Sequence, residues 1–538
     1  MKSSTRTGHS FSVAPTASIQ RSKFKRDNGY KTTFDTDWLV PFFVDEALPG
    51  DTHNLRASLF ARLNTPLKPI LDNMFAETFF FEVPVRQVWD NWQKFNGEQD
   101  NPTDSTDYLV PTCTAPVGGY LEESLQDYMG IPPGIAGIEH SALFTRAYNL
   151  IWNEWFRDQN IQQSVVVNKG DGPDSPTDYK LLKRGKRHDY FTSSLPWPQK
   201  SDQYPDGVPI AIGGSAPVRG IGADPSLYPV VDKTVGESNG LTDLYATASV
   251  MDNDTLPGNS LFYVRENPNA PGYPGIYADL SDATAATVNS LRQSIAIQHL
   301  LERDARGGTR YIEVVYAHFG VRSPDLRLQR PGYLGGGRST VNISPVAQTS
   351  QSFSTASTDT PQANLAAIGT LSGTGHGFTK SFTEHTIIIG LINVRADLTY
   401  QQALNRMWSR QTRWDFYWPE FANLGEMAVL QKEIYASGVP AEDNTVFGYQ
   451  EAFADYRYKP SLITGKMRSS SPTSLDVWHL SQDFLSAPTL SDGFITENVP
   501  LDRCIATPDE PHFKLDAFIN LTSVRPMPMY GIPGLAKL

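Results

Sequence analysis

The sequence predicts a β-sandwich with long inserted loops. Strand-like segments recur from the first hundred residues to the last thirty, and the connections between them are long and variable. With 41 glycines and 39 prolines among 538 residues, the composition favours many turns over a helical bundle. The strands do not alternate regularly with helices and no repeat of fixed period is visible, which argues against a doubly wound sheet and against a repeat protein.

The composition limits the classes of function. Hydrophobic residues make up 39% of the chain, which is enough for a large core, and the net charge is −12. Any contact with a polyanion must therefore be local. Cys113 and Cys504 have no zinc spacing and fit a reducing compartment, although one long-range disulfide stays an alternative. The N-terminus lacks the apolar core of a signal peptide and no apolar run reaches the roughly eighteen residues of a membrane helix, so we expect a soluble protein.

Residues 1–34 form a predicted basic N-terminal arm. The segment is rich in serine and threonine, shows little periodicity, and sets a single acid, Asp27, against seven basic residues. These are Lys2, Arg6, Arg21, Lys23, Lys25, Arg26 and Lys31. Two interpretations stay open: a flexible terminus, or an arm that contacts nucleic acid or a neighbouring subunit.

Three segments in the first third of the chain have a clear pattern. "FAETFFFEVPV" (75–85) alternates with period two and predicts a strand that Pro84 ends. "RQVWDNWQKF" (86–95) places its large apolar residues on one helical face and predicts a short helix. "SALFTRAYNLIWNEWF" (141–156) predicts a longer helix with Ser141 as its cap.

The rest of the chain mixes long irregular stretches with ordered segments. Residues 201–280 are rich in glycine, proline and aspartate, and we interpret them as an insertion that projects from the body. The later segments predict a helix over 283–306, a strand over 310–320, an irregular stretch over 323–383, a buried strand over 385–396, a short helix over 401–411 and a strand over 515–524.

No motif in the sequence supports catalysis or a bound cofactor. "GYLGGGRS" (332–339) is similar to a phosphate-binding loop, but Pro331 precedes it and a strand-like segment follows where a helix is needed. The ten histidines do not cluster, and there is no G-x-S-x-G elbow. His188 and Asp189 could be a catalytic pair, but a structural hydrogen-bonded pair is the favoured interpretation. We expect no catalytic residue, no metal and no cofactor.

Three segments interleave basic and aromatic side chains, namely 186–200, 405–421 and 449–460. Cations that follow phosphates and rings that stack on bases are typical of single-stranded nucleic-acid binding. Arginine and aromatic residues are also enriched in the energetic centres of protein interfaces. The residues alone leave both interpretations open, with core or subunit interface somewhat favoured.

Long blocks of the sequence resemble the major capsid proteins of microviruses, most closely the gokushovirus branch of these small single-stranded DNA bacteriophages. The blocks are "FDTDWLVPFFVDEALPGDT" (34–52), "KRHDYFTSSLPWPQK" (186–200), "ERDARGGTRYIEVVYAHFGVRSPD" (302–325), "GYQEAFADYRYKPSLITGKMR" (448–468) and "RPMPMYGIPGL" (525–535). They extend over nearly the whole chain and contain many rare residues, so a chance match is implausible.

The resemblance implies an eight-stranded antiparallel jelly roll with long insertions and a few helices, set in a T=1 icosahedral shell around circular single-stranded DNA. It divides the chain into the arm 1–34, a discontinuous jelly-roll core of 35–200 and 286–538, and a surface insertion over 201–285. In the gokushovirus branch such an insertion projects at the threefold axes and is thought to meet the host. The implied partners are further copies of the chain, the genome, other virion and scaffolding proteins and a bacterial surface receptor. The implied location is the virion, assembled in the host cytoplasm.

Two sets of contact residues follow. The DNA-facing candidates are Lys23, Lys25, Arg26, Lys186, Arg187, Arg406, Arg410, Arg413, Arg457 and Lys459. The subunit-contact candidates are Trp197, Trp408, Trp414, Trp418, Tyr456 and Tyr458. Trp197 lies between Pro196 and Pro198, and we expect it to be the buried anchor of a rigid base for the insertion.

Two other classes of function stay open. An enzyme acting on polysaccharide or peptide could use a β-sandwich scaffold, although nothing in the sequence pairs the carboxylates of acidic loops such as "DGPDSPTD". A receptor-binding or adhesin-like protein without a shell role is the second, and the basic arm argues mildly against it. An enzyme should be a small oligomer with turnover, and a receptor binder should bind cells without forming particles.

Overall fold

The structure is a computed structural model that describes residues 20–198, 200, 288–322, 324, 329–350 and 362–531, with short strands between 218 and 278. The chain divides into two compact units. The larger comprises Met1–Pro198 and Asp304–Leu538, and the smaller comprises Gln199–Arg303. Residues 1–19 of the predicted arm lie outside the described residues.

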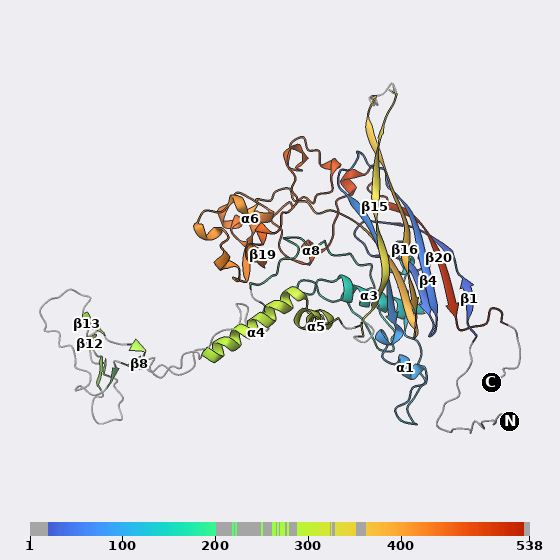
Figure 1. The fold of residues 1–538 in the computed structure, drawn as a ribbon, viewed down its shortest axis with the longest axis horizontal. Coiled ribbons are helices and arrows are strands. Elements are labelled where there is room, and N and C mark those ends of the chain that lie inside the picture. Colours follow the sequence, from blue (N-terminus) through green and yellow to red (C-terminus); the bar gives the residue numbers. More distant parts are fainter. Residues whose placement is uncertain are drawn as a thin grey trace, which may run out of the picture. The chain divides into compact units, whose positions relative to one another are not determined.

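The larger unit is built on one curled antiparallel sheet that is eight strands wide (Figure 1). Its order is β1–β20–β4–β16–β15–β5–β17–β3, and β2 also pairs with β20. The strands are β1 (Ser22–Lys25), β2 (Asn28–Phe34), β3 (Val40–Ala47), β4 (Thr52–Leu63), β5 (Met74–Pro84), β15 (Gly332–Ala347), β16 (Leu365–Ser381), β17 (Thr386–Ala396) and β20 (Phe513–Arg525). The mainly β, antiparallel jelly-roll prediction is confirmed.

The described part of the predicted arm belongs to this sheet. β1 pairs with the end of β20, from Ser22 opposite Arg525, and β2 pairs with its beginning, up to Phe34 opposite Phe513. A flexible terminus is therefore the wrong interpretation for residues 22–34. Their backbone hydrogen bonds go to β20, a partner that local pattern cannot reveal.

The main core packs against one face of the sheet. In β4 and β20 buried and exposed residues alternate, so Leu55 and Leu521 point inward while Phe60 and Phe518 remain exposed on the outer face. β17 is buried along its whole length, because a second apolar cluster around Trp89 covers its other face. This double coverage explains the continuous apolar run that predicted a buried strand over 385–396.

The predicted helices are confirmed in part. Helix α3 (Leu143–Ile151) continues as a π-helical turn to Phe156, and α4 (Val288–Gly307) matches the helix expected over 283–306. Of the helix expected over 86–95, only a 3-10 turn and the short α1 (Trp92–Phe95) form. The helix expected over 401–411 is reduced to a single 3-10 turn, Arg406–Trp408.

Two predictions of secondary structure are wrong. Residues 310–320 form helix α5 (Tyr311–Phe319), not a strand, and Gly320 ends it in the left-handed region at φ 70°. The stretch over 323–383 is not irregular throughout, because it contains the two longest strands of the sheet, β15 and β16. Beyond their contacts with β5 and β4 these strands pair only with each other, from Ile343 opposite Gly369 to Ala347 opposite Leu365.

The remaining elements are short. In the larger unit they are β6 (Thr112–Thr114), α2 (Leu125–Tyr128), β7 (Glu139–Ser141), β18 (Glu426–Leu430), α6 (Gln431–Ile434), α7 (Pro440–Asp443), β19 (Val446–Glu451) and α8 (Asp492–Ile495). In the smaller unit they are β8 (Val218–Arg219), β9 (Ile221–Gly222), β10 (Ser249–Val250), β11 (Leu261–Val264), β12 (Glu266–Asn267), β13 (Ala270–Pro274) and β14 (Tyr277–Ala278). Within the described residues, no helix is long and apolar enough to cross a membrane.

Candidate nucleic-acid and subunit contact surfaces

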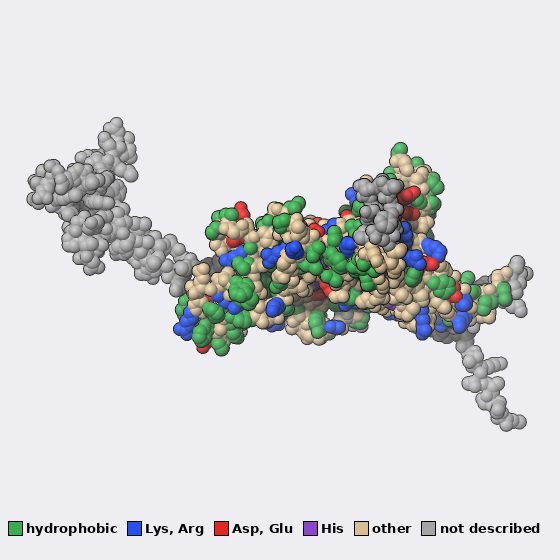
Figure 2. Space-filling view, turned by 90° about the horizontal axis from the view of Figure 1, so that it is seen from above, with side chains coloured by type: hydrophobic (Ala, Val, Ile, Leu, Met, Phe, Trp, Pro, Cys, Tyr) green, Lys and Arg blue, Asp and Glu red, His purple; other side chains and the backbone are tan. Residues whose placement is uncertain are grey.

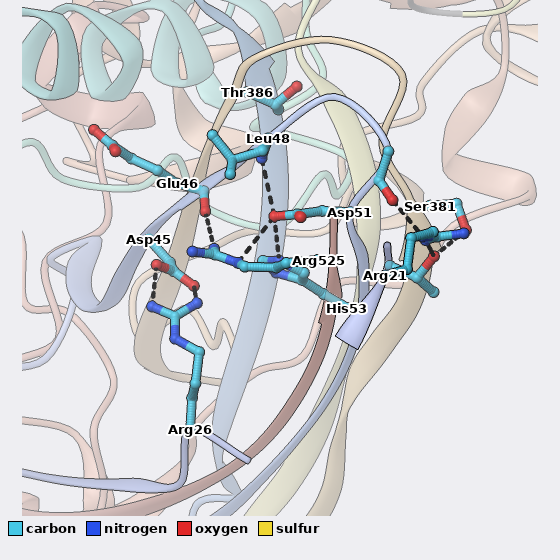
Figure 3. Close-up of polar contacts among 12 residues, drawn as sticks. Arg21, Arg26, Asp45, Glu46, Leu48, Asp51, His53, Ser381, Thr386 and Arg525 are labelled. Carbon is cyan, nitrogen blue, oxygen red and sulfur yellow. Dashed lines mark hydrogen bonds and ion pairs between the residues drawn. The ribbon is translucent and has the colours of Figure 1, made fainter. Parts of the chain in front are cut away.

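The basic residues of the first strand have two different environments. Lys23 and Lys25 are exposed, and the ammonium of Lys25 lies 3.0 Å from the carboxylate of Asp27 at the surface. Arg26 instead donates two hydrogen bonds to Asp45, at 2.7 and 2.8 Å, and this pairing raises the pKa of Arg26 although burial opposes it (Figure 3). Arg26 thus attaches the N-terminal strands to β3, while the two lysines face solvent.

A polar cluster that the sequence analysis missed closes the corner where β1, β4 and β20 meet (Figure 3). The Asp51 carboxylate accepts a hydrogen bond from the Leu48 amide at 2.9 Å and lies 3.1 Å from Nε of Arg525. It also lies 3.2 Å from Nε2 of His53, whose side chain is fully buried, and burial lowers the pKa of His53. The one signal in the sequence is register, because His53 occupies an inward-facing position of the alternating strand β4.

The first two basic side chains of segment Lys186–Lys200 make contacts within the subunit. The side chain of Lys186 is buried, donates to Oε1 of Gln482 at 2.8 Å and lies 4.4 Å from the ring centre of Phe494. Burial lowers the pKa of Lys186 to about 8. Arg187 pairs with Asp397 at 2.9 Å and lies 5.0 Å over the ring of Phe75. Both side chains are therefore committed to contacts within the chain.

Glu77 on β5 forms ion pairs with several cations of this region. It forms an ion pair with Arg184, lies 3.1 Å from Arg395, and lies 3.5 Å from Arg187. Burial would raise the pKa of Glu77, but the arginines, Arg184 first, outweigh burial and hold the pKa below its usual value. The group is a largely buried ion-pair network that joins segment 184–187 to the sheet.

His188 and Asp189 are not arranged as a catalytic pair. Asp189 accepts hydrogen bonds from the backbone amides of Phe191 at 2.9 Å and Thr192 at 2.8 Å, and from the hydroxyl of Tyr400 at 2.5 Å. This is the geometry of an aspartate that stabilises a turn. Asp189 thus has a structural role in the turn, while His188 is exposed.

The arginines of segment 405–421 differ in the same way. Arg406 donates to the carbonyl of Ala428 at 2.8 Å and pairs with Glu433 at 3.3 Å. Arg410 pairs with Asp455, and both side chains are almost completely buried. Arg413 remains exposed. Two of these three DNA-facing candidates thus support the fold of this region.

An exposed aromatic face surrounds these arginines. Arg410 lies 4.2 Å from the ring centre of Tyr456, which in turn lies 6.3 Å from the ring of Tyr417. Arg413 lies 4.7 Å over Trp418 and 5.7 Å over Trp414. The aromatic face comprises Trp414, Tyr417, Trp418 and Tyr456, with exposed fractions of 66%, 47%, 39% and 52%. Large rings exposed close to one another are typical of an interaction surface.

The remaining candidates lie close to this region in the sequence. Trp408 and Tyr458 are also exposed, at 72% and 54%. Arg457 pairs with Glu451 but keeps about half of its side chain exposed, and Lys459 is exposed. Trp197 is half-buried, so its predicted role as a buried anchor stays a prediction.

Basic side chains do not form one continuous patch on the visible face of the molecule. Figure 2 shows the blue lysine and arginine groups scattered among hydrophobic and neutral ones. Residues 332–339, which are similar to a phosphate loop, are part of strand β15, so no helix N-terminus is available there. Among the described residues, no group of three or more His, Cys, Asp or Glu side chains could hold a metal ion.

Comparison with known proteins shows which protein family the chain is similar to. A family model described as "Capsid protein (F protein)" matches residues 12–535. The chain is 50% identical over 533 residues to capsid protein VP1 of Bdellovibrio phage phiMH2K, covering 98% of this chain and 97% of that protein. It is 43% identical to VP1 of Chlamydia phage 1 and 36% identical to VP1 of Spiroplasma virus 4, with 98% of each chain covered in both comparisons. A curled jelly-roll sheet, an exposed aromatic face and a match along nearly the whole sequence agree, and the chain belongs to the F-type capsid protein family of microviruses.

Proposed function

We propose that this capsid protein is the subunit of a T=1 icosahedral shell that encloses circular single-stranded DNA. As a capsid protein it is a component of the virion and contacts further copies of itself. The observation that carries the proposal is the aromatic face, because four large rings left exposed on an isolated chain are typical of a surface that a partner covers. A closed shell multiplies such individually weak contacts by symmetry.

The side chains that remain exposed refine the DNA-facing set. Arg26, Lys186, Arg187, Arg406 and Arg410 are engaged within the chain, through the acids and acceptors described above. The candidates whose side chains stay exposed are Lys23, Lys25, Arg413, Arg457 and Lys459, of which Lys25 and Arg457 also pair with Asp27 and Glu451. These few groups, on a chain of net charge −12, fit separate local contacts with weak sequence preference.

We propose further that residues 201–285 form an outer insertion that meets a bacterial surface receptor, and that 35–200 and 286–538 form the shell. The separation of Gln199–Arg303 from the rest of the chain as its own compact unit supports this division. Scaffolding proteins and other virion proteins would be further partners during assembly.

Electron microscopy tests the proposal. The protein should be produced together with its genomic neighbours, purified, and imaged with and without nuclease treatment. Uniform icosahedral particles that carry threefold projections and protect single-stranded DNA are the expected result. Only monomers or small rings, with the full set of neighbours present, would contradict the shell. Particles that assemble normally but protect no DNA would contradict the packaging role alone.

A further inference from the structure

A cavity of about 550 Å³ opens between segment 184–188 and helix α5, next to the Glu77 network. One part of its wall is aromatic. Tyr333 is 46% exposed, and its ring lies 5.6 Å from the ring of Phe81 and 6.0 Å from that of Trp155. This volume is in the range of a site for a small organic ligand.

The rest of the wall is dominated by cations. Six basic side chains line it, namely Arg157, Arg184, Lys186, Arg187, Arg310 and Arg395. The acids on the wall are Asp158 and Glu313, and both are engaged: Asp158 accepts from the Asn160 amide at 2.8 Å, and Glu313 pairs with Arg310 at 3.1 Å. Glu77 and Asp397 balance part of this charge through their pairs with Arg187 and Arg395.

Three of the guanidinium groups, those of Arg157, Arg310 and Arg395, have a buried Nε without a hydrogen-bond partner, although that of Arg310 lies 3.8 Å from the Glu154 carboxylate. Arg395 as a whole is only 8% exposed. Burial and the neighbouring Arg184 lower the pKa of Arg395 to about 10, and burial together with Arg310 lowers the pKa of Arg157. A bound oxyanion would reduce the repulsion between these crowded cations and accept hydrogen bonds from their unused donors.

We propose that this cavity binds one nucleotide, with its phosphate group held by Arg157 and Arg395 and its base stacked on Tyr333. Guanidinium groups suit phosphate because their planar donors match its oxygens, and an exposed ring adds stacking that is tolerant of base identity. The inference rests on the proposed packaging function for its biological source, since a packaged strand and a free nucleotide present the same phosphate and ring.

Calorimetric titration of subunits dissociated from purified particles tests the chemistry, with inorganic phosphate and thymidine monophosphate as probes. We expect the nucleotide to bind at least tenfold more tightly than phosphate, because stacking contributes about 1–3 kcal/mol per base. Arg157→Gln should weaken both ligands about tenfold, in line with the loss of one charge-assisted hydrogen bond. Tyr333→Ala should weaken only the nucleotide, and Tyr333→Phe should retain it.

Arg62→Gln is the matched control, because Arg62 is an exposed arginine that also lies over an aromatic ring, at 5.8 Å from Phe60, on strand β4. It should leave both affinities unchanged. If neither probe binds the native subunit, or if Arg62→Gln weakens binding as much as Arg157→Gln does, the cavity is only an ion-pair network and the inference is overturned. Equal affinity for phosphate and nucleotide would overturn the role given to Tyr333.

Photo-cross-linking in intact particles identifies the source of the nucleotide. Particles grown with 5-iodouracil in their DNA should cross-link at Tyr333 or Trp155 if the packaged strand occupies the cavity. Nucleotide binding by subunits without that cross-link assigns the site to a free nucleotide. Because particle formation and DNA protection are scored separately by microscopy, failure of this inference leaves the proposed shell untouched, and failure of the shell is visible without it.

Discussion

The buried ion pair between Arg146 and Asp174 should be the most sensitive single contact of the larger unit. Both side chains are at most 1% exposed, and the Arg146 guanidinium donates two hydrogen bonds of 2.7 Å to the Asp174 carboxylate. It also donates to the carbonyls of Val88 at 3.0 Å and Gly170 at 2.9 Å, which joins α3 to two loops. Arg146→Met removes all four bonds and leaves a carboxylate buried without its counter-charge.

We expect Arg146→Met to lower the free energy of unfolding by roughly 3–5 kcal/mol, the range for removing one partner of a buried pair. Arg146→Lys keeps the charge but cannot reproduce the fork, and should cost about 1–3 kcal/mol. The double change Arg146→Met with Asp174→Leu leaves no buried charge and should be more stable than Arg146→Met alone. Urea unfolding of dissociated subunits, followed by tryptophan fluorescence, measures all three variants.

The dependence on pH gives the prediction a second readout. Burial would raise the pKa of Asp174, but hydrogen bonds from Arg146 and Tyr179 outweigh burial and hold the pKa below its usual value. In the native chain this pair therefore contributes stability above about pH 4 and loses it as the pH falls through the depressed pKa. In Arg146→Met the carboxyl can protonate at higher pH, so the deficit should shrink between pH 8 and pH 4. A cost under about 1 kcal/mol, or a deficit independent of pH, would refute the reasoning.

Four further predictions concern assembly, subunit stability and packaging. Trp414→Ala should lower particle yield several-fold and leave the urea midpoint of the subunit unchanged, because the ring is 66% exposed. Trp197→Ala should lower both particle yield and the heat stability of particles. Glu497→Gln should stabilise the subunit above pH 7, because burial raises the pKa of Glu497 to about 7, so the native chain loses stability as the pH rises from the unfolded value towards 7. Raising the salt concentration should release DNA contacts in opened particles, measured by nuclease access, without unfolding the subunits.

Each of these has a contrary outcome. Leu485 is 95% exposed outside the aromatic face, so a yield for Leu485→Ala as low as that for Trp414→Ala would remove the special role of the rings. Unchanged yield and heat stability for Trp197→Ala would remove its role as an anchor. If Glu497→Gln is less stable than the native chain at pH 8, neighbouring cations compensate for the burial of the ionised carboxylate. Nucleotide contacts that persist at high salt would contradict the prediction that the protein holds DNA mainly by electrostatic attraction.

The sequence predicted the elements that carry their own signal. β17 and α3 were predictable because a continuous apolar run and an apolar stripe at helical spacing can be recognised without knowledge of tertiary contacts. Helix α5 was mistaken for a strand because its β-branched residues favour strands in isolation, and local helical hydrogen bonds override that preference in the fold. β15 lacked alternation because close packing requires glycine: a Cβ on Gly336 would overlap the carbonyl oxygen of Thr78, and one on Gly337 would meet the ring of His376 at 2.7 Å.

The contact surfaces were predictable only as segments. Basic and aromatic spacing located the aromatic face, but it could not separate an exposed Arg413 from a buried Arg410. The partner of Arg410, Asp455, lies 45 residues away in the sequence, and that of Arg187, Asp397, lies 210 away. A charge that is neutralised by such a distant acid looks the same in the sequence as one that faces DNA.

The position of β20 in the sheet sets the order of events during synthesis. β20 lies between β4 on one side and β1 with β2 on the other, so the ribosome makes both neighbours more than four hundred residues before the strand that joins them. Until Phe513–Arg525 emerges, both flanking strands present unpaired edges, and pairing across so long a span is slow. A nascent or truncated chain without β20 is therefore unable to complete its sheet, and its open strand edges are prone to wrong pairing until β20 is made.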